Sequence, residues 1–261
     1  MGCTSSSAGQ ASGPGSAPAA AGKTGAAAGT KAASKDLIEV SYFGTFGPLP
    51  NPPYARVDPF KQMLSHAGAN WKFNGIKDTE WPAVKASGNT GEFGAMPFVK
   101  QGGQTYDLSI PALRRLAQQF GYYPANDWKK ATTVDMIAET YSDAFNALTG
   151  PFANPALSDA EKGEKVVATI GETGICTKFF NLVDAALARN GNGKYLVGNQ
   201  LTYADFCLTS FIFNHFKNDQ FPVVSVIGPW LSKNYPRVDA YAEELRAANK
   251  KHLDSRLPSP F

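Results

Sequence analysis

The cysteines and histidines are the side chains of this sequence that most readily act as nucleophiles or metal ligands. Cys176 and Cys207 stand within apolar helical patterns and have no partner in a C-x-x-C motif, which is typical of core residues. The histidines, which are His66, His215 and His252, lack the spacing of metal ligands. We therefore predict neither a metal site nor a cysteine nucleophile.

The N-terminus indicates a different chemistry, the attachment of lipid. The chain begins with the letters MGCTSS, which fit the pattern for myristoylation of Gly2 and provide Cys3 for S-palmitoylation. Two acyl chains anchor a protein stably, whereas one gives only marginal binding. We expect a cytoplasmic protein that acylation of these residues attaches to the cytoplasmic face of a membrane. The alternative is a solvated leader that matches the pattern by chance.

Composition separates a tail from the body of the chain. Residues 2–35 are almost wholly Gly, Ala, Ser, Thr, Pro and Lys, so we predict a disordered tail over 1–35. Its three lysines leave 22 of the 25 basic residues, against all 22 acidic ones, for residues 36–261. This neutral body argues against nucleic-acid binding, which needs clustered Lys and Arg. The sequence contains no run of 18 or more apolar residues, so we predict no membrane-spanning helix.

The body opens with the pattern of a strand, a loop and a helix. Residues 37–43 alternate between apolar and polar side chains, which predicts a strand that ends near Tyr42. Four prolines and two glycines over 44–53 predict a loop. Apolar residues at helical spacing predict a helix from about Arg56.

A hairpin and a second helix follow. Residues 96–106 contain two short apolar runs around a Gly-Gly turn, with Pro97 at the start of the first run. Ser109 is the predicted N-cap of the next helix, and Gly121 is its predicted end. Residues 36–121 therefore form a predicted α/β unit.

The pattern beyond this unit is helical throughout. One helix is predicted over 134–148 and should stop at the Gly-Pro pair of 150–151. The next is predicted over 158–190, where it starts with a capping box and is kinked or broken by glycines within 171–174. The second half of the chain is thus a predicted helical bundle.

The sharpest local signal is a helix start at Thr202. This N-cap and Asp205 form a capping box, and Leu201 and Phe206 stand at the positions of a hydrophobic staple. Almost every residue up to Phe216 is apolar or small, so we expect the helix to lie in the centre of the bundle. Asp205 is then a buried cap with a role in folding rather than in catalysis.

Taken in this order, these elements resemble the cytosolic glutathione transferases over about residues 37–255, and the sigma-like class resembles them most. Five motifs carry the resemblance: SYF at 41–43, EWP at 80–82 with Lys85, FGAMP at 93–97, LVGN at 196–199 and TYADF at 202–206.

The resemblance implies a fold and a function. It implies a thioredoxin-like N-terminal domain over 36–121 followed by an all-helical glutathione-transferase C-terminal domain over 122–261, a cis bond before Pro97 and a homodimer. The implied reaction joins the glutathione thiolate to small hydrophobic electrophiles, with glutathione-dependent isomerase or peroxidase activity as side reactions. Glutathione is then a co-substrate, and no cofactor is needed.

Tyr42 matches the tyrosine whose hydroxyl donates a hydrogen bond to the glutathione thiolate in this family. A hydrogen bond to a charged group is worth about 1.5–3 kcal/mol, which lowers a thiol pKa of about 8.5 by about one to two units. Ser41 and Thr45 are the alternative hydroxyl donors. The alternative to a catalytic role is that Tyr42 only covers a strand edge.

The resemblance also assigns residues that hold glutathione. Trp81 and Lys85 match the groups that bind the glycyl carboxylate, and their alternatives are packing and a solvated surface. Met96 and Pro97 would offer backbone groups to the cysteinyl part, unless Pro97 only begins an edge strand.

Three further matches complete the implied site. Arg56 matches an arginine near the active site. Ser109, at the positive end of its helix, would receive the γ-glutamyl carboxylate. Asp143 matches an acid that reaches the γ-glutamyl amine across the dimer interface, although it also fits an exposed helical residue. A sigma-like calcium site is not predicted, because it needs three acids on the interface helix and only Glu139 and Asp143 remain there.

Several residues depart from the family pattern. Leu108 stands where the family usually has Gln, and the proline-rich loop between Tyr42 and Arg56 is about eight residues longer than usual. Ala95 replaces a frequent Lys or Gln, and residues 88–91 form a short insertion. Leu108, the long proline-rich loop and the predicted lipid tail motivate an alternative function, a non-enzymatic glutathione-transferase-like binding or scaffold protein that is tethered to a membrane.

Overall fold

The structure is a computed structural model that describes residues 36–45, 47 and 51–260. Gly2 and Cys3, where the sequence predicts acylation, lie outside these residues, as does part of the proline-rich loop. No helix in the described part of the chain is long and apolar enough to cross a membrane.

A four-stranded mixed sheet forms the first half of the described chain, with the strand order β2-β1-β3-β4. The strand β1 (Ile38–Thr45) pairs in parallel with β2 (Trp71–Lys77) and antiparallel with β3 (Phe98–Gln101), which forms a hairpin with β4 (Gln104–Tyr106). This hairpin confirms the predicted one. The predicted end of β1 near Tyr42 is wrong, because pairing with β2 continues to Thr45 through a register shift.

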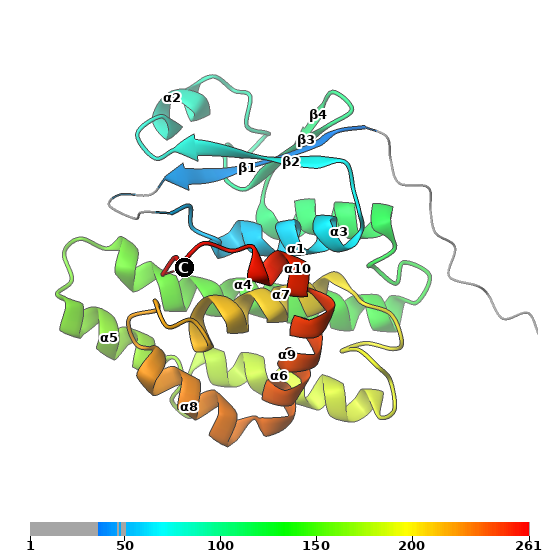
Figure 1. The fold of residues 1–261 in the computed structure, drawn as a ribbon, viewed down its shortest axis with the longest axis vertical. Coiled ribbons are helices and arrows are strands. Elements are labelled where there is room, and N and C mark those ends of the chain that lie inside the picture. Colours follow the sequence, from blue (N-terminus) through cyan, green and yellow to red (C-terminus); the bar gives the residue numbers. More distant parts are fainter. Residues whose placement is uncertain (1–35, 46, 48–50, 261) are drawn as a thin grey trace, which may run out of the picture. The chain divides into compact units, whose positions relative to one another are not determined.

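Helices cover the sheet on both faces. The 3₁₀ turn η1 (Ala55–Val57) leads into α1 (Asp58–His66), and α3 (Ser109–Phe120) lies beside it on the same face, while α2 (Trp81–Ala86) lies on the other face (Figure 1). Gly121, with a φ of 82°, takes the left-handed conformation that ends α3. These elements confirm the thioredoxin-like fold class, and the exact domain boundary at 121 stays a prediction.

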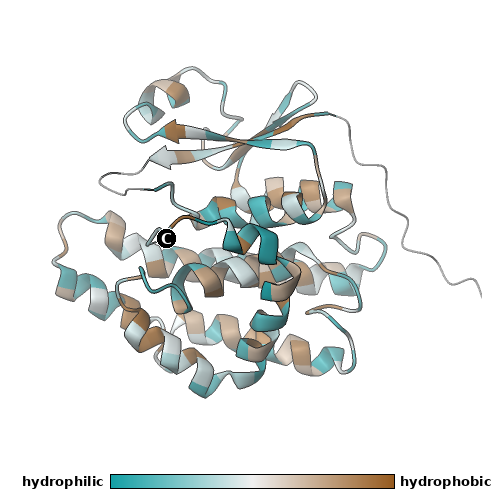
Figure 2. Ribbon diagram, viewed as in Figure 1, coloured by the Kyte–Doolittle hydropathy of each residue, from teal (hydrophilic) through white to brown (hydrophobic). Residues whose placement is uncertain are grey.

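The second half is all-helical, as predicted. Its elements are α4 (Trp128–Ala153), α5 (Asp159–Ala168), α6 (Ile175–Asn190), α7 (Tyr203–Phe211), the π-helical turn η2 (Ile212–Phe216), α8 (Val224–Asn234), α9 (Pro236–Ala248) and α10 (Lys250–Asp254). Every residue of α7 and η2 is buried. The helix α7 contacts α1, α3, α4, α9 and η2. By contrast, most of α10 is hydrophilic (Figure 2).

Two expectations about helix ends have different outcomes. The predicted break is confirmed, because α5 ends at Ala168 and α6 begins after Gly174, where a side chain would meet the carbonyl of Thr169. The predicted stop at Gly150-Pro151 is wrong, since α4 continues to Ala153. Pro151 lies within the last turn of the helix, and the packing of Phe152 against Phe221, at 5.6 Å between ring centroids, holds this turn.

Asp205 is the buried cap that the sequence predicts. Its carboxylate accepts hydrogen bonds from the backbone N–H and hydroxyl of Thr202, at 2.7 and 2.8 Å. It also accepts from the backbone N–H of Leu196 at 3.1 Å and from the hydroxyl of Tyr241 at 2.5 Å. One side chain therefore joins the start of α7 to the preceding loop and to α9.

We predict that Asp205→Ala destabilises the protein by about 2–4 kcal/mol, because a lost cap costs about 1 kcal/mol and buried donors left without an acceptor cost about 1–3 kcal/mol. Urea unfolding followed by circular dichroism measures this change. The control is Asp159→Ala, which removes a fully exposed carboxylate from the first turn of α5 and should cost less than about 0.5 kcal/mol. Equal effects of the two substitutions would contradict the role given to Asp205.

Candidate functional site

A largely apolar cavity of about 290 Å³ lies between the chain that follows β1 and the C-terminal half of α4. Tyr42 and Arg56 contribute to one wall, and α4 provides the other. Its volume suits a small organic molecule. This cavity brings the candidate catalytic tyrosine together with side chains from the helical half.

Tyr42 reaches this cavity from the central strand of the sheet, and only 8% of its surface is exposed. The antiparallel pairing of Ser41 with Phe98 continues towards Pro97, whose bond to Met96 is cis. Burial raises the pKa of Tyr42 to about 12, while the charge and the backbone N–H of Arg56 oppose this rise. The phenol is therefore protonated at neutral pH and acts as a hydrogen-bond donor rather than as a base.

Arg56 links Tyr42 to two other elements. Its Nη1 donates to the hydroxyl of Ser109 on α3 at 3.3 Å and to the hydroxyl of Ser142 on α4 at 3.1 Å. Its Nη2 donates to the side-chain oxygen of Asn146, and the guanidinium lies 4.9 Å from the centroid of the Phe145 ring. The side chain of Arg56 therefore connects the start of α3 to the wall that α4 forms.

The prediction that Ser109 is the N-cap of its helix is wrong. Leu108 occupies the cap position, with a φ of 64° and a ψ of 123°, and Ser109 is the first helical residue. The hydroxyl of Ser109 accepts from Arg56 and does not cap the helix. Ser109 remains at the N-terminal, positive end of α3, which is the property that anion binding requires.

The residues predicted to hold the other parts of glutathione lie around the same end of the sheet. Trp81 begins α2, is half-buried, and places its ring 6.4 Å from that of Phe43 in an edge-on arrangement. Lys85 is exposed on α2 and its stem runs next to Gly94. Met96 is half-buried and Pro97 is buried, and the two residues directly precede β3.

The remaining candidate residues do not line the cavity at Tyr42. Asp143 is exposed on α4, next to Ser142, and its expected role at a dimer interface stays a prediction. Ser41 is fully buried and accepts a hydrogen bond from Asn74, so this alternative hydroxyl faces away from solvent. Thr45 is exposed at the end of β1.

Sequence reasoning missed the wall that α4 provides. Asn146 and Phe145 contact Arg56, and Phe152 closes the cavity near the end of the helix. The only sequence signal was the apolar stripe of the predicted helix, in which Phe145 serves the core. Among the described residues, no group of three or more His, Cys, Asp or Glu side chains could hold a metal ion.

Comparisons with known proteins find glutathione transferases among the similar sequences and structures. Residues 146–253 match the family described as the glutathione S-transferase C-terminal domain. The chain is 26% identical over 213 residues to a probable glutathione S-transferase 6 of Caenorhabditis elegans, covering 80% of this chain and 96% of that protein. It is 24% identical over 213 residues to glutathione S-transferase P of Bos taurus, covering 80% and 90% of the two chains.

Solved structures of similar fold include a Nu-class glutathione transferase from Haemonchus contortus, with 26% identity, a TM-score of 0.64 and coverage of 87% of this chain and 100% of that one. A sigma-class enzyme from Fasciola hepatica superposes with a TM-score of 0.68 at 20% identity, covering 87% and 99% of the chains. The second likeness concerns the fold alone.

The two described cysteines, Cys176 and Cys207, are fully buried, as the sequence predicts. Burial raises the pKa of Cys176 to about 12 and that of Cys207 well above its ordinary value, so neither forms the reactive thiolate near neutral pH.

We predict that a Cys3→Ser variant does not react rapidly with Ellman's reagent while it is folded. After unfolding in guanidinium chloride, two thiols per chain should react. The absorbance of the released thionitrobenzoate measures both states. A thiol of the folded variant that reacts within seconds would show that one of these cysteines is accessible and activated.

Proposed function

Because the chain belongs to the cytosolic glutathione transferase family, we propose that it binds glutathione and transfers the glutathione thiolate to small hydrophobic electrophiles. The observation that carries this proposal is the protonated, buried hydroxyl of Tyr42 at the wall of an apolar cavity. Isomerase and peroxidase reactions that use glutathione fall within the same proposal.

The mechanism rests on stabilisation of a thiolate. The hydroxyl of Tyr42 donates a hydrogen bond to the sulfur of bound glutathione, and the thiol proton passes to solvent. The positive charge of Arg56, which already acts on Tyr42, favours the anion further. The thiolate then forms a bond to an electrophilic carbon, and the leaving group departs with its electron pair.

The proposed position of glutathione follows the positive and polar groups around the end of the sheet. Its γ-glutamyl carboxylate lies at the N-terminus of α3, near Ser109 and the guanidinium of Arg56, which are 3.3 Å apart. Its cysteinyl part pairs with the backbone at Met96 and Pro97. Its glycyl carboxylate lies near Trp81 and Lys85 on α2.

The electrophile occupies the apolar cavity in this proposal. Phe43 and Phe152 contribute aromatic surface, and Pro53 and Ala55 contribute small apolar groups. Such walls select for hydrophobic molecules and provide few polar groups for orientation. The substrate is therefore a class of small hydrophobic electrophiles rather than one polar metabolite.

Two other features of the proposal concern the setting of the enzyme, namely its assembly and its attachment to a membrane. A homodimer would allow Asp143, exposed on α4, to reach the γ-glutamyl amine in the partner's site. Acylation of Gly2 and Cys3 would hold the protein at the cytoplasmic face of a membrane. The alternative of a non-enzymatic binding or scaffold protein is retained because Leu108 provides no side-chain amide for the γ-glutamyl group.

We predict that Tyr42→Phe lowers kcat/KM for conjugation of glutathione to 1-chloro-2,4-dinitrobenzene by about 10- to 150-fold, because it removes a hydrogen bond to a charged group worth about 1.5–3 kcal/mol. The matched control is Tyr235→Phe, which removes a hydroxyl that bonds to Asn181 in the helical half and should leave kcat/KM within about twofold. Wild-type protein that neither binds immobilised glutathione nor turns over would instead support the binding or scaffold alternative.

We further predict that Leu108→Gln tightens glutathione binding by about tenfold, because Leu108 lies at the start of α3 and an amide there adds a hydrogen bond to a charged group. Isothermal titration calorimetry measures the affinity. Leu108→Met, which changes the side chain without adding a donor, is the control and should bind as the wild type does. An unchanged affinity in Leu108→Gln would place the γ-glutamyl group elsewhere.

A further inference from the structure

A second and larger cavity, of about 610 Å³, lies on another part of the described chain. It is formed by α1, the first residues of β2, the segment before η1 and the C-terminal residues that follow α9. Aromatic side chains of Tyr54, Trp71 and Phe73 line it, and Leu64 and Leu257 add aliphatic surface. It shares no lining residue with the cavity at Tyr42.

Lys61 of α1 is the unusual member of this lining. Only 9% of its surface is exposed, yet its ammonium makes no hydrogen bond and no ion pair within the described residues. Its Nζ lies 3.8 Å from the centroid of the Phe73 ring and 5.3 Å from that of Tyr54. Cation–π contacts compensate only part of the cost of removing an ammonium from water.

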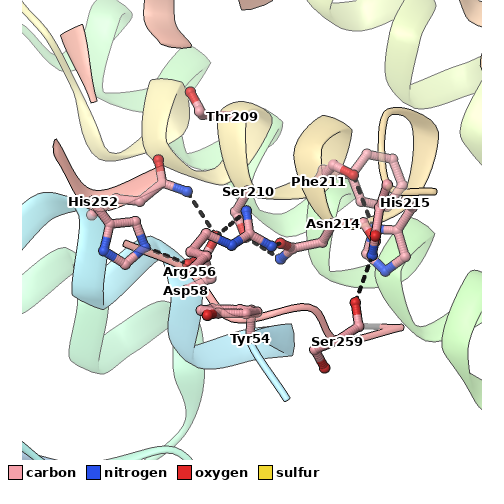
Figure 3. A network of polar contacts seen from close by, with 12 residues as sticks. Tyr54, Asp58, Thr209, Ser210, Phe211, Asn214, His215, His252, Arg256 and Ser259 are labelled. Carbon is pink, nitrogen blue, oxygen red and sulfur yellow. Dashed lines mark hydrogen bonds and ion pairs between the residues drawn. The ribbon is translucent and has the colours of Figure 1, made fainter. Parts of the chain in front are cut away.

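The nearest acid is already engaged by other groups. Asp58, which is fully buried, accepts from His252 at 2.8 Å and from Gln62 at 2.8 Å. Arg256 lies 3.8 Å from the same carboxylate and 4.1 Å from the centroid of the Tyr54 ring. Figure 3 shows Asp58 and His252 next to Arg256, with the Tyr54 ring beneath it.

The charges around the cavity therefore do not balance. Burial alone would raise the pKa of Asp58, but Arg256 and His252 lower it far below its usual range, so the carboxylate is ionised. Its charge offsets that of Arg256, and none of the described lining residues is acidic. Lys251 is exposed and solvated, which leaves the ammonium at the cavity end of the buried Lys61 side chain as the charge without an ion-pair partner among the described residues.

We propose that this cavity binds an amphipathic organic anion, an arylcarboxylate, with its carboxylate on the ammonium of Lys61 and its aromatic body between the rings of Tyr54, Trp71 and Phe73. A single carboxylate supplies the missing negative charge. The cavity volume lies within the range of small-molecule sites. The site is separate from the proposed reaction and does not depend on it.

The test uses the full chain with 1-naphthaleneacetate as the anionic probe and 1-naphthaleneacetamide as its neutral counterpart. Isothermal titration calorimetry at pH 7 measures both affinities. We expect saturable binding of the acetate, a loss of at least tenfold in Lys61→Met and retention within about threefold in Lys61→Arg. The amide should bind more weakly and equally to all three proteins, because it carries no charge for Lys61 to attract.

Three results would overturn the proposal: no saturable binding of the acetate, equal affinity in wild type and Lys61→Met, or a loss of binding in Phe152→Ala, which alters the cavity at Tyr42 instead. Thermal unfolding shows whether each variant is folded. Conjugation activity of Lys61→Met should equal that of the wild type, which separates this site from the proposed catalytic one.

A pH series on the wild type gives a readout that does not depend on a variant. Burial lowers the pKa of Lys61 to about 8, with Asp58 opposing and Arg256 assisting; the other titratable groups around it are Tyr54, Lys251 and His252. Because the charged ammonium binds the anion, affinity should fall by about tenfold between pH 7 and 9. Lys61→Arg should lose this dependence, and a wild-type affinity that is constant over this range would contradict the assignment.

Discussion

The guanidinium of Arg56 is the group on which the arrangement of the candidate site depends. It donates to Ser109 on α3 and to Ser142 and Asn146 on α4, and its positive charge opposes the rise that burial causes in the pKa of Tyr42. A planar guanidinium with five donors holds several acceptors in one geometry. One residue therefore determines how the phenol, the start of α3 and the wall formed by α4 lie relative to one another.

The short segment before α1 connects this site to the rest of the molecule. Pro53 and Ala55 line the cavity at Tyr42, whereas Pro52 and Tyr54 line the cavity at Lys61. Alternate residues of one segment thus contribute to two cavities of different chemistry. The first cavity is apolar and contains a protonated phenol, and the second combines aromatic walls with an unpaired cation. The buried helix α7 packs against α1, which lines the cavity at Lys61, and against α4, which lines the cavity at Tyr42.

Local patterns in the sequence predict the features that depend on neighbouring residues, such as β1, the hairpin and the capping box of α7. The strand β2 was missed because residues 71–77 include an Asn-Gly pair and lack clean alternation. The end of α4 was misplaced because aromatic packing outweighs the effect of Pro151. The cavity at Lys61 could not be predicted, since it depends on contacts such as Asp58 with His252, 194 residues apart in the chain.

The pKa of the glutathione thiol when bound to the protein tests the central claim most directly. The ultraviolet absorbance of the thiolate, followed as a function of pH in wild type and in Tyr42→Phe, measures it. The account predicts a midpoint about one to two units below the ordinary value of about 8.5 in the wild type, and a return towards about 8.5 when the hydroxyl is removed. A wild-type midpoint of about 8.5 would contradict the role of Tyr42 in stabilising the thiolate.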